Sequence, residues 1–207
     1  MVAMFIILFV GAFFFAPIVA LYNHSKVSYW HSVCVADSAR KLSRAMGHGT
    51  MYSFYVYLNG LFHDVGKILV PAEILHKNGK LTDEEFGIIK SHASNLVACM
   101  YGVFFPACVG HHKDFAGTGY GAAKFQNEVS AIIEVCDVHN AICGYFRTYR
   151  DVTPQDVVVA EMNKSERKFD PELFQFFMAN IDMFDVSEAA KKADAKMRQN
   201  SEVAKAN

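Results

Sequence analysis

The sequence lacks features that several protein classes need. Its 20 basic and 21 acidic residues give a formal net charge of −1, so it has no basic excess with which to neutralise nucleic-acid phosphates. None of its five cysteines forms a C-x-x-C pair, which argues against a disulfide framework or a zinc finger. No alternating strand pattern of useful length and no internal repeat occurs. We therefore expect a helical protein with free thiols and no DNA or RNA polymer as its partner.

Charged residues are also missing from positions 1–22, which read MVAMFIILFVGAFFFAPIVALY. The length of this run matches the thickness of a bilayer core, at ~20 residues with ~1.5 Å rise each. The first basic residues come after it, at Lys26, Arg40, Lys41 and Arg44. Under the positive-inside rule, we expect residues 1–22 to anchor the chain in the cytoplasmic (inner) membrane, with the rest facing the cytoplasm. A buried core helix is the alternative interpretation.

The remaining chain reads as one helical domain. With 207 residues and 52% hydrophobic content, it is long enough for one domain with a sizeable core and too short for two comfortable ones. We expect an all-α fold, a bundle of about six or seven helices over residues 23–184, behind the N-terminal hydrophobic helix. Residues 185–207 are rich in Ala, Lys, Asp and Glu, which is typical of a polar tail.

Local capping signals predict three of the helix starts. Thr82 followed by Glu85 is the pattern of a capping box. Thr153-Pro154 and Asp170-Pro171 each combine a capping side chain with a proline suited to the first turn.

Histidines and aspartates in short, specific contexts mark a candidate metal site. In a bundle, side chains from successive helices converge on one interior point. Imidazoles with carboxylates suit iron, manganese or zinc, whereas calcium prefers oxygen ligands. Neighbours on a helix point ~100° apart, so His63 and Asp64 would reach different sides of a metal cluster, with Asp64 bridging two ions. The candidate ligands are His31, His63, Asp64, His92, His111, His112 and Asp137.

These residues lie in motifs that resemble a known family, the HD-GYP branch of the HD phosphohydrolases. Residues 63–67 (HDVGK) are similar to its HD-x-G-K core, and residues 71–85 to its P-x-x-I-L-x-K-x-G-x-L-T-x-x-E linker. The resemblance covers roughly residues 27–180. Further matches are His31 with the first metal histidine, His92 with the histidine after the linker, His111-His112 with the double histidine, residues 117–121 (GTGYG) with the name-giving loop, Asp137 with the last metal aspartate, residues 147–150 (RTYR) with R-P-Y-R, and residues 169–171 with F-D-P.

The resemblance implies a metal-dependent phosphodiesterase that hydrolyses cyclic di-GMP, to linear pGpG or on to GMP, in bacterial second-messenger signalling. It implies two divalent ions, iron or manganese above zinc. By analogy, His31, His63, Asp64 and Asp137 hold one ion, while Asp64, His92, His111 and His112 hold the other. Asp64 and Lys67 are the expected catalytic residues. The expected substrate-binding residues are Lys67, Gly119, Tyr120, Arg147 and Arg150.

Several positions depart from the family pattern. Gly121 makes the loop GYG in place of GYP, Lys113 replaces the usual Glu, Ala116 the usual Asp, and Ala131 a usual Arg. Val27 stands where three-metal members carry Glu, which favours two metals. The other four changes leave open a weak or inactive module that binds a nucleotide or a partner protein, and a phosphohydrolase for another nucleotide. A homodimer also stays open.

The glycine in the loop leads to a first prediction. Proline fixes φ and glycine frees it, so Gly121 predicts a more mobile substrate loop with altered selectivity. On this basis Gly121→Pro should raise the turnover of cyclic di-GMP in a hydrolysis assay, and an unchanged or lower rate would contradict the prediction.

Overall fold

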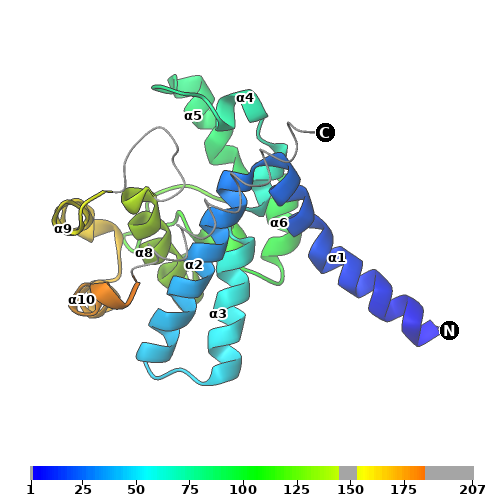
Figure 1. Ribbon diagram of the computed structural model, residues 1–207, viewed down its shortest axis with the longest axis horizontal. Coiled ribbons are helices and arrows are strands. Elements are labelled where there is room, and N and C mark those ends of the chain that lie inside the picture. The colour runs from blue at the N-terminus through cyan, green and yellow to red at the C-terminus, as the bar shows by residue number, and fades with distance from the viewer. Residues whose placement is uncertain (1, 145–152, 185–207) are drawn as a thin grey trace, which may run out of the picture.

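The computed structural model describes residues 2–144 and 153–184. Every regular element in these ranges is helical, which confirms the expected all-α class (Figure 1). The predicted contacts Arg147 and Arg150 and the tail 185–207 lie outside the described residues. The long helices are α1 (Val2–His24), α2 (Lys26–Ala45), α3 (Thr50–Phe62) and α8 (Glu128–Cys143). The shorter helices, with η denoting the 3-10 type, are η1 (Val65–Leu69), α4 (Ala72–Leu75), α5 (Asp83–Lys90), η2 (Ser91–Ala93), α6 (Leu96–Gly102), α7 (Ala107–Gly110), α9 (Gln155–Lys164), η3 (Glu166–Lys168), α10 (Pro171–Ala179) and η4 (Ile181–Phe184).

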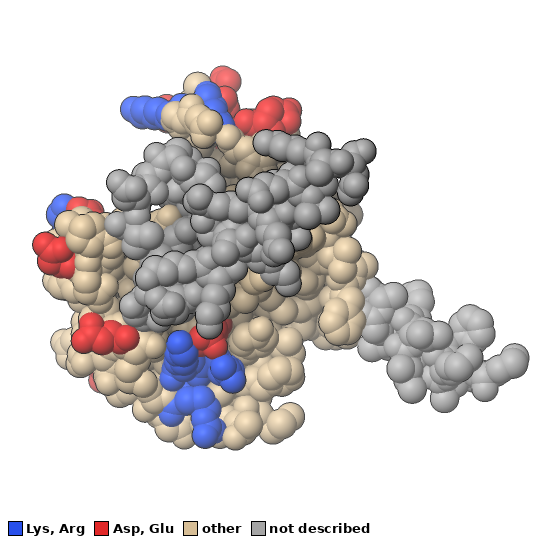
Figure 2. All heavy atoms as spheres, viewed as in Figure 1, with Lys and Arg blue, Asp and Glu red and all other residues tan. Residues whose placement is uncertain are grey.

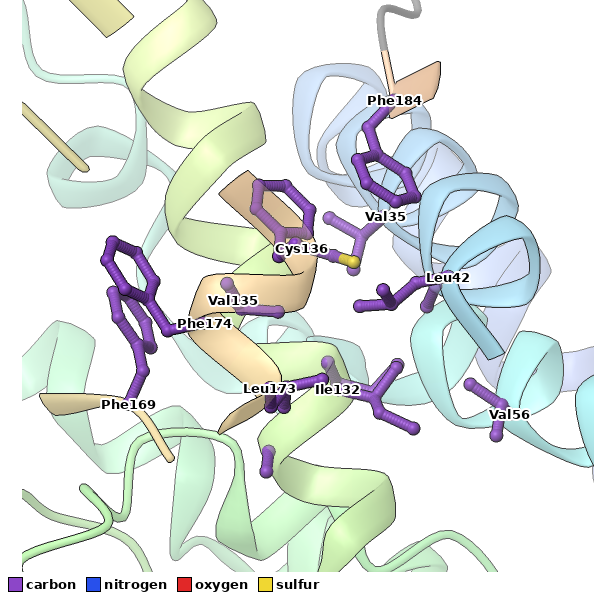
Figure 3. Packing of buried hydrophobic residues seen from close by; sticks show 14 of the residues in the cluster. Val35, Leu42, Val56, Ile132, Val135, Cys136, Phe169, Leu173, Phe174 and Phe184 are labelled. Carbon is purple, nitrogen blue, oxygen red and sulfur yellow. The ribbon is translucent and has the colours of Figure 1, made fainter. Parts of the chain in front are cut away.

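The scaffold of the domain is the α2–α3 hairpin with α8 packed against it. Apolar side chains spaced by three and four residues place one face of each helix inward. Figure 3 shows Val35 and Leu42 of α2 meeting Ile132 and Cys136 of α8, and all four side chains are fully buried. Residues of α10 and η4 close the same core. The two scaffold helices α2 and α8 each carry one candidate ligand, so this core fixes their separation.

All three predicted helix starts are confirmed, and two of the three predicted caps are present. Thr82 and Glu85 form the full capping box at the start of α5, and Asp170 caps α10 through two backbone N–H groups. At the third start, α9 begins at Gln155 directly after Thr153-Pro154 as predicted, but the predicted side-chain cap is wrong, because no side chain caps α9. The Thr153 hydroxyl instead donates to the carbonyl oxygen of Ile142, at 2.7 Å. Here a tertiary contact with α8 has replaced the local capping bond.

The N-terminal helix α1 is attached to the domain by aromatic contacts. The Phe13 ring stacks on Tyr101 at 5.1 Å, and the Phe14 ring meets Phe104 edge-on at 5.5 Å. Leu21, further along α1, is fully buried. Across the described residues, no helix combines the length and the apolar character that a membrane crossing needs. The structure therefore gives no support to the spanning helix expected over residues 1–22, because α1 makes protein contacts from Phe13 onward. Attachment of this segment to a membrane stays a prediction.

Helix α8 also buries an acidic group away from the candidate ligands. Glu134 is 4% exposed and accepts a hydrogen bond from the Gln126 amide. Burial raises the pKa of Glu134 to about 8, and the negative charges of Asp114 and Asp137 add to this rise. The group is therefore protonated in the folded chain at neutral pH and ionised in the unfolded chain.

This difference predicts a pH-dependent stability. Because the folded-state pKa is raised, stability is fully present below the ordinary value of 4.5 and declines as pH rises towards about 8. Glu134→Gln removes the titrating group, so the free energy of unfolding of the variant should exceed that of the wild type at pH 8 by up to roughly 4 kcal/mol. Urea unfolding from pH 4 to pH 9 measures this, and equal pH slopes for both chains would contradict it.

Candidate metal centre

The seven candidate ligands lie mostly at helix ends, where side chains approach one point from several directions. Gly66 allows η1 and η2 to come together, because a Cβ at this position would collide with the backbone carbonyl oxygen of His92. The Asn95 amide donates to the Gly66 carbonyl oxygen at 2.8 Å and closes the same junction. The ligands are His31 in α2, His63 at the end of α3, Asp64 before η1, His92 in η2, His111 at the end of α7 followed by His112, and Asp137 in α8.

The structure brings all seven side chains into one cluster. They form three overlapping groups, each with its ligand atoms within 4.8 Å of one another. The two oxygens of Asp64 face opposite sides, with Oδ1 3.2 Å from His92 Nε2 and Oδ2 3.4 Å from His63 Nε2. Asp64 is therefore placed between the two ends of the cluster. The groups are His31 with His63 and Asp64, His63 with His111 and Asp137, and His92 with His111 and His112.

Backbone carbonyls fix the orientation of three imidazole rings. His63 Nδ1 donates to Gly60 O at 2.7 Å, and His92 Nδ1 donates to Ile89 O at 2.6 Å. His111 Nδ1 makes the corresponding bond within its own helix at 2.6 Å. A proton on Nδ1 leaves the Nε2 lone pair for a metal ion. Three Nε2 atoms are thus aimed into the cluster before any ion is bound.

Burial keeps several of these rings neutral. It lowers the pKa of His92 to about 4 and that of His112 to about 3, and it holds the pKa of His111 well below its usual range. For Asp64, burial alone would raise the pKa, but the charges of Lys67 and His63 outweigh burial and hold it well below its usual range. Neutral imidazoles and ionised carboxylates are the forms that bind metal ions.

A cavity of about 670 Å³ opens onto this cluster. The Lys67 ammonium group contacts the Asp64 carboxylate and lines the cavity. Its lining combines apolar side chains from residues 74–89 with residues of α2 and α8. The described lining residues that bear on the site are Val27, His31, Lys67, Ile74, Leu75, Lys77, Leu81, Ile89, His92, His112, Tyr120 and Asp137.

The two predicted substrate contacts in the GYG loop have different positions. Tyr120 lines the cavity, and its ring stacks on His112 with centroids 4.3 Å apart. Gly119 has φ +81°, and a Cβ there would collide with the His112 carbonyl oxygen. Gly119 therefore shapes the loop around His112, whereas only Tyr120 reaches the cavity.

The structure overturns the expected benefit of a proline at Gly121. This residue has φ +108°, which proline cannot adopt, and a Cβ would collide with the carbonyl oxygen of Val109. The flanking backbone is also held in place, because Tyr120 N–H donates to His112 O and Ala122 N–H to Ala93 O, both at 3.0 Å. Gly121 therefore permits a close approach of backbones, while the loop mobility expected from the sequence stays a prediction.

Asn59 is a positioning residue that motif matching did not identify. Its side chain is fully buried, its amide donates to Tyr55 O, and its carbonyl oxygen accepts Ala107 N–H at 3.2 Å. Ala107 O in turn accepts the Nδ1 proton of His111. Asn59 thus joins α3 to α7. His63 directly follows α3, and His111 directly follows α7. The sequence signal for this role is weak: Asn59 is an asparagine within an uncharged, largely apolar helix.

The donor set fits divalent metal ions. His63 Nε2 is buried and finds no hydrogen-bond partner among the described residues, which is costly unless the atom has another ligand. Neutral imidazoles and two ionised carboxylates surround it. The fold and this site define the class as an all-helical domain that binds divalent metal ions through histidine and aspartate.

The chain belongs to the HD domain family, whose model matches residues 15–173, as the resemblance to the HD-GYP branch predicted. A cyclic di-GMP phosphodiesterase of Pseudomonas aeruginosa is 32% identical over 178 residues, which cover 82% of this chain and 43% of that protein. A 3'3'-cGAMP-specific phosphodiesterase of Vibrio cholerae is 31% identical over 172 residues, which cover 77% of this chain and 39% of that protein. The chain therefore spans less than half the length of these two relatives.

A solved structure shares the fold. The HD domain of the Listeria monocytogenes phosphodiesterase PgpH, determined in complex with cyclic-di-AMP, aligns with a TM-score of 0.59 and 17% identity. The alignment covers 83% of this chain and 97% of that domain. The likeness supports the helical architecture described above.

The role of Asn59 can be tested by Asn59→Ala. The change leaves Ala107 N–H without its acceptor, which should cost about 1–3 kcal/mol of stability. It should also weaken metal binding by roughly 10–100-fold, as loss of a group behind the ligands does. Metal titration with manganese and thermal unfolding measure both effects. Asn163→Ala, at an exposed position of α9, is the matched control. Unchanged metal affinity in Asn59→Ala would show that Asn59 does not position the ligands.

The backbone at Gly121 predicts that a proline there destabilises the fold, whereas the sequence indicated a gain in turnover. Gly121→Pro and Gly121→Ala should each lose about 1–3 kcal/mol of stability, because both place a Cβ against Val109 O. Gly117→Ala shares the positive φ but meets no atom within 4 Å, so its loss should be smaller. Chemical denaturation of the three variants measures this. Equal losses in Gly117→Ala and Gly121→Ala would mean that the close approach contributes nothing.

Proposed function

We propose that this chain is a metal-dependent phosphodiesterase that hydrolyses cyclic di-GMP, to linear pGpG or on to GMP, in bacterial second-messenger signalling. The observation that carries the proposal is the buried cluster of five imidazoles and two carboxylates beside Lys67, at one side of a cavity. The two curated relatives described above are named for cyclic-dinucleotide phosphodiesterase activity, which supports the same substrate class.

The side chains suit phosphodiester hydrolysis. Divalent ions held by this ligand set would lower the pKa of bound water and neutralise charge on a phosphate. Lys67 lies beside Asp64 on the cavity wall, so its ammonium group is placed to pair with a phosphate oxygen as negative charge grows there. Tyr120 holds His112 by stacking and closes the same side of the cavity. Iron or manganese is the proposed metal, with zinc as a further fit.

The cavity supports a substrate of dinucleotide size. Its volume of about 670 Å³ lies within the range of roughly 300–1,000 Å³ for small-molecule sites. The apolar side chains of Ile74, Leu75, Leu81 and Ile89 in its lining would accept the face of a nucleobase, while the ligand cluster would face a phosphate.

A second candidate function is a weakly active or inactive module that binds a nucleotide or a partner protein. The four departures around the substrate loop favour it. Two of these residues have a local structural role. Lys113 pairs with Gly119 in an isolated β-bridge, and Ala131 is packed into the core. The buried ligand cluster, which is complete, favours the enzyme.

We further infer that residues 1–22 attach the domain to the cytoplasmic membrane, with the metal centre on the cytoplasmic side. The support is the uncharged run followed by Lys26, Arg40 and Lys41, together with the direction of α1, which extends away from the rest of the described chain (Figure 1). Release of the chain from membranes by alkaline sodium carbonate would contradict this inference.

One double variant, studied together with the wild type, distinguishes the enzyme from the binding module. His63→Ala with Asp64→Ala should abolish hydrolysis of cyclic di-GMP and remove bound metal, because both changes delete ligands of the cluster. Elemental mass spectrometry on the wild type, paired with a hydrolysis assay on the same sample, should give about two metals per chain and linear product. Two metals without product, with nucleotide binding retained, would favour the binding module instead.

Lys67 provides a test of the chemical step. Lys67→Met should lower kcat by roughly 10²–10³-fold with the metal content unchanged, because it removes a charge that acts on the developing phosphate charge. Lys77→Met is the matched control, since Lys77 also lines the cavity but pairs with Glu85 at 2.7 Å. Similar rates in the two variants would remove Lys67 from the mechanism.

A further inference from the structure

The tip of the α2–α3 hairpin combines exposed apolar side chains with basic ones. Met51 is 79% exposed and Phe54 is 51% exposed, and Arg40 and Arg44 are exposed on the adjoining turns of α2. We name these four residues, together with Tyr57, the hairpin patch. Helix α3 contains no charged residue over its whole length, so the apolar part of the patch meets no charge from its own helix.

Contacts across the hairpin hold the basic groups beside the apolar ones. The Arg40 guanidinium lies 5.8 Å from the centre of the Tyr57 ring, and Tyr57 stacks with Phe54 at 6.3 Å. Arg44 donates to the Thr50 hydroxyl at 3.0 Å, next to Met51. The patch is therefore arranged in advance of any contact with a partner, which lowers the cost of binding.

The apolar part of the patch continues towards α1. The Tyr55 hydroxyl of α3 donates to the carbonyl oxygen of Phe104, at 3.0 Å. The Phe104 ring is 47% exposed and packs against Phe14 of α1. In Figure 1 the turn between α2 and α3 and the N-terminal end of α1 lie on the same lower side of the view. Uncharged side chains thus connect α3 with α1, the helix that carries the uncharged N-terminal run.

The charges around the tip leave an excess of positive charge. Asp37 pairs with Arg40 at 2.9 Å and with Lys41 at 3.0 Å. Glu128 on α8 lies 3.4 Å from His48. The bases Arg40, Lys41 and Arg44 therefore outnumber the two nearby carboxylates. Figure 2 shows Lys and Arg atoms gathered on this lower side, next to uncharged surface.

The apolar side chains and the positive charge of the hairpin patch together favour one kind of binding partner. A symmetric contact with a second copy would bring two basic patches face to face, which is repulsive. An amphipathic surface with aromatic and apolar side chains beside basic ones suits the boundary of a bilayer that carries negative headgroups. We propose that the hairpin patch rests on an anionic lipid surface, with Met51 and Phe54 between the headgroups and Arg40 and Arg44 on their charges.

The full chain carrying Phe54→Trp tests the contact at the tip itself. The chain has one native tryptophan, Trp30, so the unsubstituted chain supplies the blank. Vesicles of phosphatidylcholine with about 30% phosphatidylserine should shift the emission of the introduced indole to shorter wavelength, and brominated acyl chains should quench it. Neutral vesicles and raised salt should weaken both signals.

Charge reversal supplies the decisive comparison. In the Phe54→Trp chain, Arg40→Glu with Arg44→Glu should weaken the apparent vesicle affinity at least tenfold, given about 1 kcal/mol for each basic residue near an anionic surface. Lys164→Glu with Val157→Ser, both exposed on α9, is the matched control and should leave the affinity unchanged. Thermal unfolding followed by circular dichroism confirms that each variant is folded.

Three outcomes would overturn the proposal. Chains that sediment with vesicles but show no quenching would leave attachment through residues 1–22 intact and remove the hairpin contact. Equal quenching by neutral and anionic vesicles would remove the role of Arg40 and Arg44. A wavelength shift that grows with protein concentration in the absence of vesicles would identify a second copy as the occupant. Neither the metal count nor the hydrolysis assay enters these results, so the proposal stands or fails independently of the phosphodiesterase function.

Discussion

The structure depends on keeping two carboxylates ionised in its interior. An uncompensated buried charge costs several kcal/mol, so Asp64 and Asp137 need partners from several elements. Lys67 follows Asp64 by one turn and contacts its carboxylate directly. For Asp137 the partner is His31, whose Nε2 lies 2.7 Å from the carboxylate on the facing scaffold helix. The contacts of Asp64 and Asp137 therefore link η1 and α2 to the ligand cluster, within the separation that the apolar core sets.

The architecture divides between long helices that form the scaffold and short ones that deliver ligands. The α2–α3 hairpin and α8 contain most of the buried core, and they supply His31 and Asp137 from within a helix. The helices η1, η2 and α7 span five residues or fewer, and they bring in the other candidate ligands except His63, which directly follows α3. Side-chain amides position the short helices, since buried Asn59 and half-buried Asn95 each tie one of them to its neighbour.

Local patterns predicted part of this arrangement. The HDVGK stretch identified the family, and the Thr82 and Asp170 caps are where the sequence indicated, because each depends on residues within one turn. The failures involve partners that are distant in sequence. Thr153 bonds to α8 instead of its own helix, and Gly121 has its conformation because Val109 lies against it. Periodicity and motif spacing contain no information on such neighbours, so the ligand set was accessible from sequence while its supports were not.

The hydrogen bonds from imidazole Nδ1 atoms to backbone carbonyls have a consequence for how the protein acquires its ions. His63 and His92 are oriented by the turns of chain that precede them, and each bond is independent of the other ligands. Such rings do not need an ion to set their orientation, so the folded chain would be able to take up its ions after synthesis. The ion present then reflects the supply in the cell when the finished chain meets it. Two identical chains, made under different metal supply, can therefore differ in chemistry without differing in fold.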